Sequence, residues 1–178
     1  GIAMGTSEAV GYVDGEGNIC GWLNELAFAP VDGQPDAMED EWSGDIGCGV
    51  KYISQDAVIK LAENAGIKFE QTLTPAEKLK KVQDLLESGD LIAKRIFADI
   101  GIYLGYTLAF YSEFYDIDYL LLLGRVTSGS AGAIIAENAK LVLDEEYPSL
   151  SSIKIVLPDE SNKRVGQSIA AASLTSVS

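Results

Sequence analysis

The sequence predicts an α/β protein, with a mixed β-sheet that carries helices on both faces. Three observations support this fold class. Residues 1–31 are β-prone segments separated by turn signals, several later segments repeat apolar residues at helical spacing, and the wholly apolar run Tyr119–Leu123 precedes a Gly/Ser-rich loop. The expected order is β-β-β-α-β-α-β-α, in a single domain that spans residues 1–178.

The amino-terminal third is expected to begin with an antiparallel three-stranded meander. Residues 1–13 end in alternating small and β-prone side chains, and Asp14-Gly15-Glu16-Gly17-Asn18 is a strong turn signal. The second strand is expected at residues 19–23 and the third at residues 25–31. The acidic stretch 33–44, which contains Pro35, predicts a surface loop.

The remaining elements are marked by capping residues and apolar periodicity. Ser54 is a helix N-cap, Gly66 ends the same helix, and Thr74-Pro75-Ala76-Glu77 begins the next one. The expected helices span residues 54–65, 74–88, 91–115, 130–146 and 162–174. The expected strands span residues 118–123 and 152–157, and the first of these is apolar on both faces, as in a central parallel strand.

Two glycines interrupt the longest predicted helix. Gly101 and Gly105 are four residues apart, and each destabilises a helix by about 1 kcal/mol relative to alanine. Glycines on one helix face allow a second backbone to pass close by. The alternative is that they only make the helix flexible.

The composition excludes several classes of function. A net charge of −14 opposes contact with DNA or RNA, because a nucleic-acid binder must neutralise phosphates. No apolar run approaches the roughly 18 residues of a membrane span, and no signal-peptide pattern is present, so a cytoplasmic location is expected. The sequence has two cysteines and no histidine, which excludes a Ser-His or Cys-His nucleophile pair and a typical zinc site.

Four stretches suggest a family when they are taken in order. They are Met4-Gly5-Thr6-Ser7-Glu8-Ala9-Val10-Gly11-Tyr12, Asn24-Glu25-Leu26-Ala27-Phe28-Ala29-Pro30-Val31-Asp32, Gly47-Cys48-Gly49-Val50-Lys51-Tyr52-Ile53-Ser54 and Leu121-Leu122-Leu123-Gly124-Arg125-Val126-Thr127-Ser128-Gly129. With the predicted element order, which is that of a ribonuclease-H-like unit, they resemble the carboxy-terminal lobe of ROK proteins (repressors, open reading frames and sugar kinases). That lobe is one half of an actin-like ATPase fold.

The first stretch resembles the Gly-Thr-Gly-rich turn that faces the ATP phosphates in this family. The resemblance implies that Gly5, Thr6 and Gly11 bind phosphate, since backbone N–H groups and a hydroxyl can approach its oxygens closely. Glu8 departs from the family pattern, and a carboxylate there would repel phosphate unless a cation intervened. By its spacing alone, the stretch fits a plain β-hairpin better than a phosphate-binding turn.

The second and third stretches resemble the sugar-binding and zinc-binding segments of the family. The resemblance implies that Glu25 accepts hydrogen bonds from sugar hydroxyls, and Asp45 is a candidate replacement for a second glutamate, whose position holds Val50. Phe28 stands where the family has histidine, and a core aromatic is the expected role. Trp42 could stack on a sugar ring or close over the core. Cys48 matches one zinc ligand, but its partners are absent, so no zinc is expected.

The fourth stretch resembles the loop against which adenosine lies. The resemblance implies nucleotide contacts from Gly124, Arg125, Ser128 and Gly129. Arg125 replaces a glycine of the family and could crowd the base or stack on it. Residues 165–172 resemble the small-residue terminal helix of the family.

The resemblance implies a sugar kinase that uses ATP with magnesium, transfers a phosphoryl group to a hexose and forms a homodimer. No segment matches the first lobe, which carries the catalytic base, so we expect the chain to be the second lobe of a longer protein and inactive as a kinase by itself. Two alternatives remain: a non-catalytic sugar-sensing or regulatory lobe, which Phe28 and Val50 favour, and a dimerisation module without a small ligand.

Overall fold

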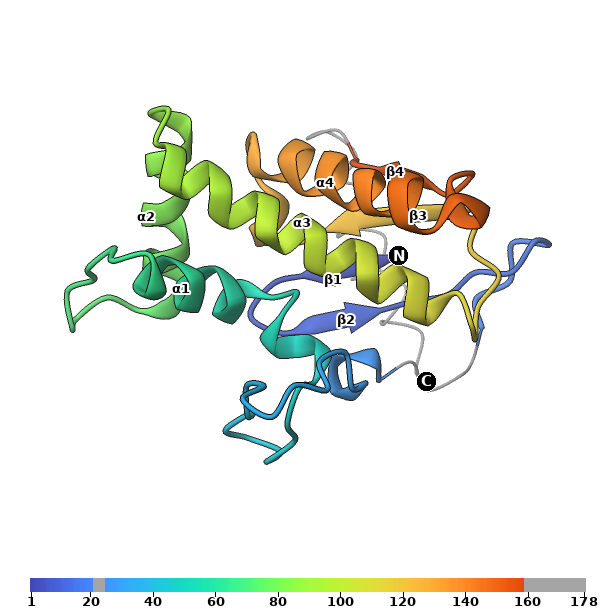
Figure 1. The fold of residues 1–178 in the computed structure, drawn as a ribbon, viewed down its shortest axis with the longest axis horizontal. Coiled ribbons are helices and arrows are strands. Elements are labelled where there is room, and N and C mark those ends of the chain that lie inside the picture. Colours follow the sequence, from blue (N-terminus) through green and yellow to red (C-terminus); the bar gives the residue numbers. More distant parts are fainter. Residues whose placement is uncertain (21–24, 159–178) are drawn as a thin grey trace, which may run out of the picture.

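A computed structural model describes residues 1–20 and 25–158, and in it helices α3 and α4 lie across one face of a four-stranded sheet (Figure 1). The strand order is β2-β1-β3-β4. Strands β1 and β2 form an antiparallel hairpin, whereas β1–β3 and β3–β4 are parallel. The strands are β1 (Ile2–Met4), β2 (Glu8–Val10), β3 (Tyr119–Leu123) and β4 (Lys154–Val156). The sheet is therefore mixed, as the sequence predicts.

Two of the described helices begin at the predicted capping residues Ser54 and Thr74, and a third begins at Asp90, a cap that was not predicted. Ser54 accepts a hydrogen bond from the Asp56 backbone, Thr74 and Glu77 form a reciprocal capping box, and Asp90 accepts from the Ala93 backbone. The helices are α1 (Gln55–Asn64), α2 (Pro75–Glu87), α3 (Leu91–Tyr111) and α4 (Ala131–Glu146). The predicted helix at residues 162–174 lies outside the described residues, so helices on both faces of the sheet stay a prediction.

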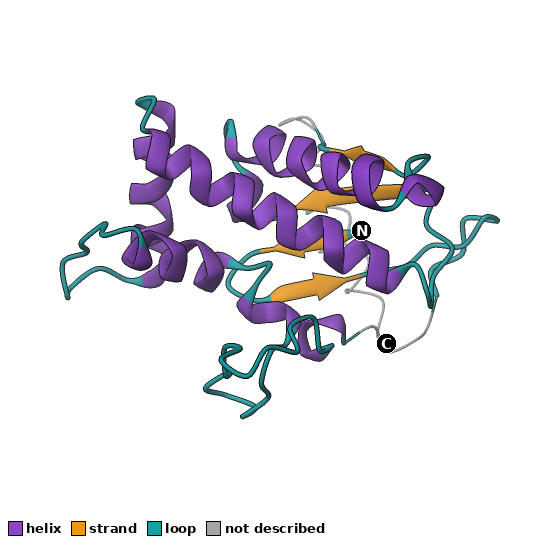
Figure 2. Cartoon of the chain, in the orientation of Figure 1, coloured by secondary structure: helices purple, strands orange, loops and turns teal. Residues whose placement is uncertain are grey.

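The two helices that cover the sheet pack closely against each other (Figure 2). A Cβ added to Gly101 would lie 2.6 Å from the carbonyl oxygen of Ile135, and one added to Gly105 would lie 2.6 Å from Cβ of Val142. The prediction that a second backbone passes along these glycines is confirmed. The core between helices and sheet includes the buried side chains of Ile2, Met4, Phe97, Ile100, Leu104, Leu108, Leu120, Leu122, Ile135 and Leu143.

The predicted three-stranded meander is wrong. Residues 1–13 contain both strands of the hairpin, joined at Gly5–Ser7, and Leu26–Phe28 is a 3-10 helix (η1) instead of a strand. The backbone after η1 finds its partners in a loop, because Val31 N–H and Asp32 N–H both donate to the carbonyl of Gly47. Of the expected second strand, Ile19 forms an isolated bridge with Val13, and residues 21–23 lie outside the described residues.

Strand β3 is buried on one face only within the described part of the chain. Leu120 and Leu122 are buried under the helices, whereas Tyr119 and Leu121 are exposed. The sequence predicted burial on both faces, and the described residues differ because α3 and α4 cover a single face.

None of the helices in residues 1–20 and 25–158 combines the length and the hydrophobicity that a membrane span needs.

Candidate functional site

Two polar loops meet at one edge of the sheet. Strands β1 and β3 are parallel, with Ala3 paired to Leu123, so the turn after β1 and the loop after β3 leave the same edge. Gly124 makes the meeting possible: it has a φ of +95°, and a Cβ there would lie 2.2 Å from the carbonyl oxygen of Met4. The loop continues into the 3-10 helix η3 (Arg125–Thr127).

A contact between side chains joins the two loops. Nη2 of Arg125 lies 3.4 Å from Oγ1 of Thr6 and donates a hydrogen bond to it. The structure therefore brings together two sets of candidates that are more than 100 residues apart in the sequence: Gly5 and Thr6 from the phosphate set, and Gly124 and Arg125 from the nucleotide set.

The backbone of the turn Gly5–Ser7 is held by hydrogen bonds, and the side chains of Thr6 and Ser7 are exposed. The carbonyl of Gly5 accepts a hydrogen bond of 2.9 Å from the N–H of Gln55, at the start of α1, and the N–H of Gly5 donates to the carbonyl of Ser7. The hydroxyl of Thr6 accepts from Arg125, and that of Ser7 donates to the carbonyl of Glu8 at 3.4 Å.

Gly11, the third phosphate candidate, lies at the opposite end of the hairpin. Its carbonyl accepts from the amino terminus of Gly1 at 2.7 Å, and its N–H donates to the carbonyl of Gly1. Because the whole length of β2 separates it from the turn, it cannot contact the same phosphate as Thr6. We therefore remove Gly11 from the candidate site.

Glu8 points away from the phosphate candidates and into the protein. Its side chain is buried, its Oε1 accepts a hydrogen bond of 3.2 Å from Tyr111, and its Oε2 has no partner among the described residues. Burial raises the pKa of Glu8 to about 7, against the opposing effect of the Tyr111 hydrogen bond. The expected repulsion of phosphate by this carboxylate is therefore reduced by its position.

A cavity of about 410 Å³ lies between α2 and the loop after β3. Three of the nucleotide candidates, Arg125, Ser128 and Gly129, line one side of it. The amide of Gln83 fixes the two walls by donating to the carbonyl of Arg125 at 2.8 Å, and Glu87 accepts from both N–H and Oγ of Ser130. The opposite wall is made of Ala76, Leu79, Lys80, Gln83, Asp84 and Glu87.

The wall that α2 provides was missed by the sequence analysis. Its apolar spacing indicates which face of the helix is buried, but spacing cannot distinguish packing against the core from lining a cavity.

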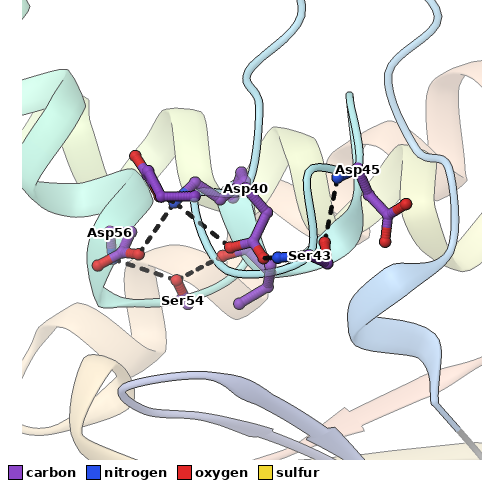
Figure 3. Close-up of polar contacts among 8 residues, drawn as sticks. Asp40, Ser43, Asp45, Ser54 and Asp56 are labelled. Atoms are coloured by element: carbon purple, nitrogen blue, oxygen red, sulfur yellow. Dashed lines mark hydrogen bonds and ion pairs between the residues drawn. The ribbon is translucent and has the colours of Figure 1, made fainter.

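The two sugar candidates lie on separate segments, both exposed. Glu25 is the N-cap of η1, and Asp45 lies in the loop before the 3-10 helix η2 (Gly49–Lys51). The backbone of Asp45 is held by a hydrogen bond of 3.1 Å to Oγ of Ser43, and its carboxylate points away from the neighbouring ion pairs (Figure 3).

A buried lysine holds this loop in place. Nζ of Lys51 lies 2.6 Å from Glu41, 3.3 Å from Asp56 and 3.7 Å from Asp40, and its side chain is 7% exposed (Figure 3). Burial lowers the pKa of Lys51, but the carboxylates of Glu41 and Asp56 outweigh that effect, so the pKa is raised overall. This cluster could not be predicted from the sequence, because its four charges converge only in the folded chain.

Two aromatic side chains are more exposed than the sequence predicts. Phe28 is 36% exposed, so it is not the core aromatic that was expected, and Trp42 is 83% exposed, so it does not close over the core. The two rings instead contact each other, with centroids 5.8 Å apart.

The surroundings of Cys48 do not fit a zinc site. Cys48 is buried in a small apolar cluster with Ala27 and Val50, and burial raises the pKa of its thiol. Zinc prefers thiolate and imidazole ligands, and no group of three or more His, Cys, Asp or Glu side chains within residues 1–20 and 25–158 is placed to hold a metal.

No protein-family model matches the sequence, and no curated protein matches it either. Solved structures do match. A ROK family glucokinase from Streptomyces griseus, in complex with glucose and AMPPNP, has a TM-score of 0.65 and 17% identity over 88% of this chain. A ROK family transcriptional regulator, a homolog of the E. coli MLC protein, has a TM-score of 0.66 and 19% identity over 88% of this chain. A ROK hexokinase from Thermus thermophilus has a TM-score of 0.60 and 17% identity over 93% of this chain.

These matches define the fold. The chain is an α/β domain that spans 54%, 40% and 53% of the lengths of those three proteins, or about half. It has the fold of the corresponding part of ROK-family proteins, among which are both kinases and a transcriptional regulator.

Proposed function

We propose that residues 1–178 are the carboxy-terminal lobe of a ROK-type protein and that this lobe binds ATP between α2 and the loop after β3. In the whole protein, the first lobe would supply the catalytic base, and the γ-phosphoryl group would pass to a hexose hydroxyl. The fold shared with a glucokinase supports this proposal, and so does the convergence of two loops at one edge of the sheet.

The observation that carries the proposal is the contact between Arg125 and Thr6. In a chain with a net charge of −14, a bound triphosphate needs a local cation. The guanidinium group of Arg125 lies beside an exposed hydroxyl at the phosphate turn, where it can donate to phosphate oxygens. This position supports a contact between Arg125 and the phosphates. The sequence had left open whether Arg125 crowds the base or stacks on it.

The adjoining cavity suits the adenosine. Its volume of about 410 Å³ is typical of small-molecule sites. Ala76, which is half-buried, gives this wall an apolar position that a base could contact, and Ser128 and Gly129 line the opposite wall. A magnesium ion stays a prediction. Glu8 is the one carboxylate in the turn-bearing hairpin Ile2–Val10, and because its side chain is buried it does not face the phosphate candidates.

The regulatory alternative has support of its own. The transcriptional regulator matches the fold as well as the glucokinase does, with TM-scores of 0.66 and 0.65. Phe28 and Val50 occupy positions where the kinase resemblance implies a histidine and a glutamate. Incubation of the full-length protein with ATP and a panel of hexoses separates the two: turnover supports the kinase, and sugar-dependent thermal stabilisation without turnover supports the regulator. The homodimer and the cytoplasmic location stay predictions.

The test of nucleotide binding is the variant Arg125→Ala, titrated separately with AMPPNP and with adenosine. Loss of charge-assisted hydrogen bonds should weaken AMPPNP binding about tenfold and leave adenosine binding unchanged. Arg95→Ala is the matched control, since Arg95 is an exposed arginine that pairs with Asp99 on α3. Equal losses for both ligands, or no loss of AMPPNP binding, would contradict the phosphate role.

A further inference from the structure

An exposed aromatic pair joins the two segments that carry the sugar candidates. Phe28 and Glu25 belong to the same short segment, with Glu25 as the N-cap and Phe28 as the last residue of η1. Residues three apart lie on about the same side of a 3-10 turn, and the Phe28 N–H donates to the Glu25 carbonyl at 3.1 Å. Glu25 and Phe28 are therefore neighbours on one short turn, and both are exposed.

The second ring and the second carboxylate come from the facing loop. Trp42 is three residues before Asp45, and the backbone between them is fixed by hydrogen bonds from Ser43 N–H to Asp40 and from Gly44 N–H to the Asp40 carbonyl. The contact between the rings of Phe28 and Trp42, at 5.8 Å, brings this loop against η1. The two segments that the ring contact joins thus also carry the two exposed carboxylates.

The loop that carries Trp42 is held in shape before any ligand arrives. Asp40 and Glu41, which directly precede Trp42, both lie within ion-pair distance of the buried Lys51 (Figure 3). A ligand that stacks on Trp42 therefore meets a positioned side chain and does not have to order the loop.

We propose that Phe28 and Trp42 form an aromatic wall of the sugar site, on which the C–H face of a pyranose ring packs while Glu25 and Asp45 accept hydrogen bonds from its hydroxyl groups. The inference rests on the proposed function and names the residues that select its sugar. It assigns to Phe28 a contact with the sugar in place of the histidine that the family pattern has there.

The chemistry of the patch favours a sugar over other ligands. Neither Glu25 nor Asp45 forms an ion pair or a side-chain hydrogen bond with another described residue, so both keep their acceptor capacity. A pyranose offers hydroxyl donors at its rim and apolar C–H groups on its face, which matches two carboxylates beside two rings. An anionic ligand would be repelled by the same carboxylates.

The experiment uses the full-length protein with Trp22→Phe, which leaves Trp42 as the only tryptophan of this chain. Glucose and glucitol are titrated while Trp42 emission is recorded. Glucitol has the hydroxyl groups but no ring, so it lacks a flat C–H face. The inference predicts that glucose shifts the emission and that glucitol does so at least about tenfold more weakly, a difference of about 1.4 kcal/mol.

Two substitutions then assign the wall by calorimetry. Trp42→Ala should weaken glucose binding about tenfold, and Phe28→Ala should weaken it by less. The double variant should lose less binding free energy than the sum of the two single losses, because the rings contact each other. Both side chains are exposed, so the fold should persist, and AMPPNP affinity should stay unchanged.

The outcomes separate this inference from the proposed function. If glucose binds equally well to Trp42→Ala, the aromatic wall is overturned and the sugar-binding proposal survives. If AMPPNP binds but neither glucose nor N-acetylmannosamine does, both the wall and the sugar half of the proposed function fail. A change in sedimentation of Trp42→Ala without any change in sugar affinity would assign the pair to a protein interface and would also overturn the wall.

Discussion

The hydroxyl of Tyr111 lies 3.2 Å from Oε1 of Glu8 and 3.2 Å from the carbonyl oxygen of Leu26. A phenol has one proton, so it can donate to only one of these acceptors at a time. A proton on Glu8 would allow both contacts, since Glu8 could donate to Tyr111 while Tyr111 donates to Leu26. The geometry therefore agrees with the burial that raises the pKa of Glu8 to about 7.

The first prediction is that Glu8 makes the protein less stable as the pH rises. The pKa of Glu8 is raised from 4.5 to about 7, so between these values the folded state holds a proton that the unfolded state has released. The free energy of unfolding should fall across this window, and Glu8→Gln should remove that part of the fall. At pH 8 the variant should be more stable, by roughly 2–3 kcal/mol.

Urea unfolding at pH 5 and pH 8 measures this difference. Glu25→Gln, the same substitution at an exposed glutamate, serves as the control. Identical pH dependence in the parent and in Glu8→Gln would show that Glu8 is ionised throughout.

The second prediction concerns the contact between α3 and α4. Gly101→Ala gains about 1 kcal/mol of helix propensity, but the new Cβ would lie 2.6 Å from the backbone oxygen of Ile135, which cannot rotate away. The clash should prevail, with a net loss of about 1–3 kcal/mol in the free energy of unfolding. Thermal or urea unfolding measures it. Gly15→Ala is the control, since no atom lies within 4 Å of its added Cβ. A Gly101→Ala variant more stable than the parent would contradict the close packing.

The third prediction concerns the ion cluster around Lys51. Lys51→Met removes the cation that three carboxylates share and leaves Asp40 buried beside them, so the protein should lose about 1–3 kcal/mol of stability. Lys80→Met removes an exposed pair with Asp84 on α2 and should change stability by less than about 0.5 kcal/mol. Urea unfolding of both variants checks the contrast. Equal effects would mean that Lys51 is no more than a surface charge.

The parts of the fold that the sequence predicted are those with local causes. Ser54 and Thr74 cap helices through hydrogen bonds within three residues, so their signals are visible in a short window. Gly101 and Gly105 were informative because glycine inside a helix is unfavourable unless packing requires it.

The parts that it did not predict depend on distant partners. Residues 25–31 have the composition of a strand, but the hydrogen bonds after η1 go to Gly47 in another loop, and no local pattern reveals this. The sequence grouped Gly11 with Gly5 and Thr6, but the hairpin reverses at Gly5–Ser7 and carries Gly11 to its far end. The cavity wall on α2 and the Phe28–Trp42 contact likewise form between segments that only the folded chain brings together.

The most direct test of nucleotide binding between α2 and the loop after β3 is calorimetric titration of AMPPNP into the protein and into its Ala76→Trp variant. Ala76 lines the cavity, and an indole ring there would fill space that the base requires. Gln71→Trp places the same ring on the exposed turn before α2 and serves as the control. We expect the parent and Gln71→Trp to bind AMPPNP alike and Ala76→Trp to bind at least about tenfold more weakly, with its unfolding transition retained. Equal binding to all three proteins, or no binding to the parent, would contradict the site.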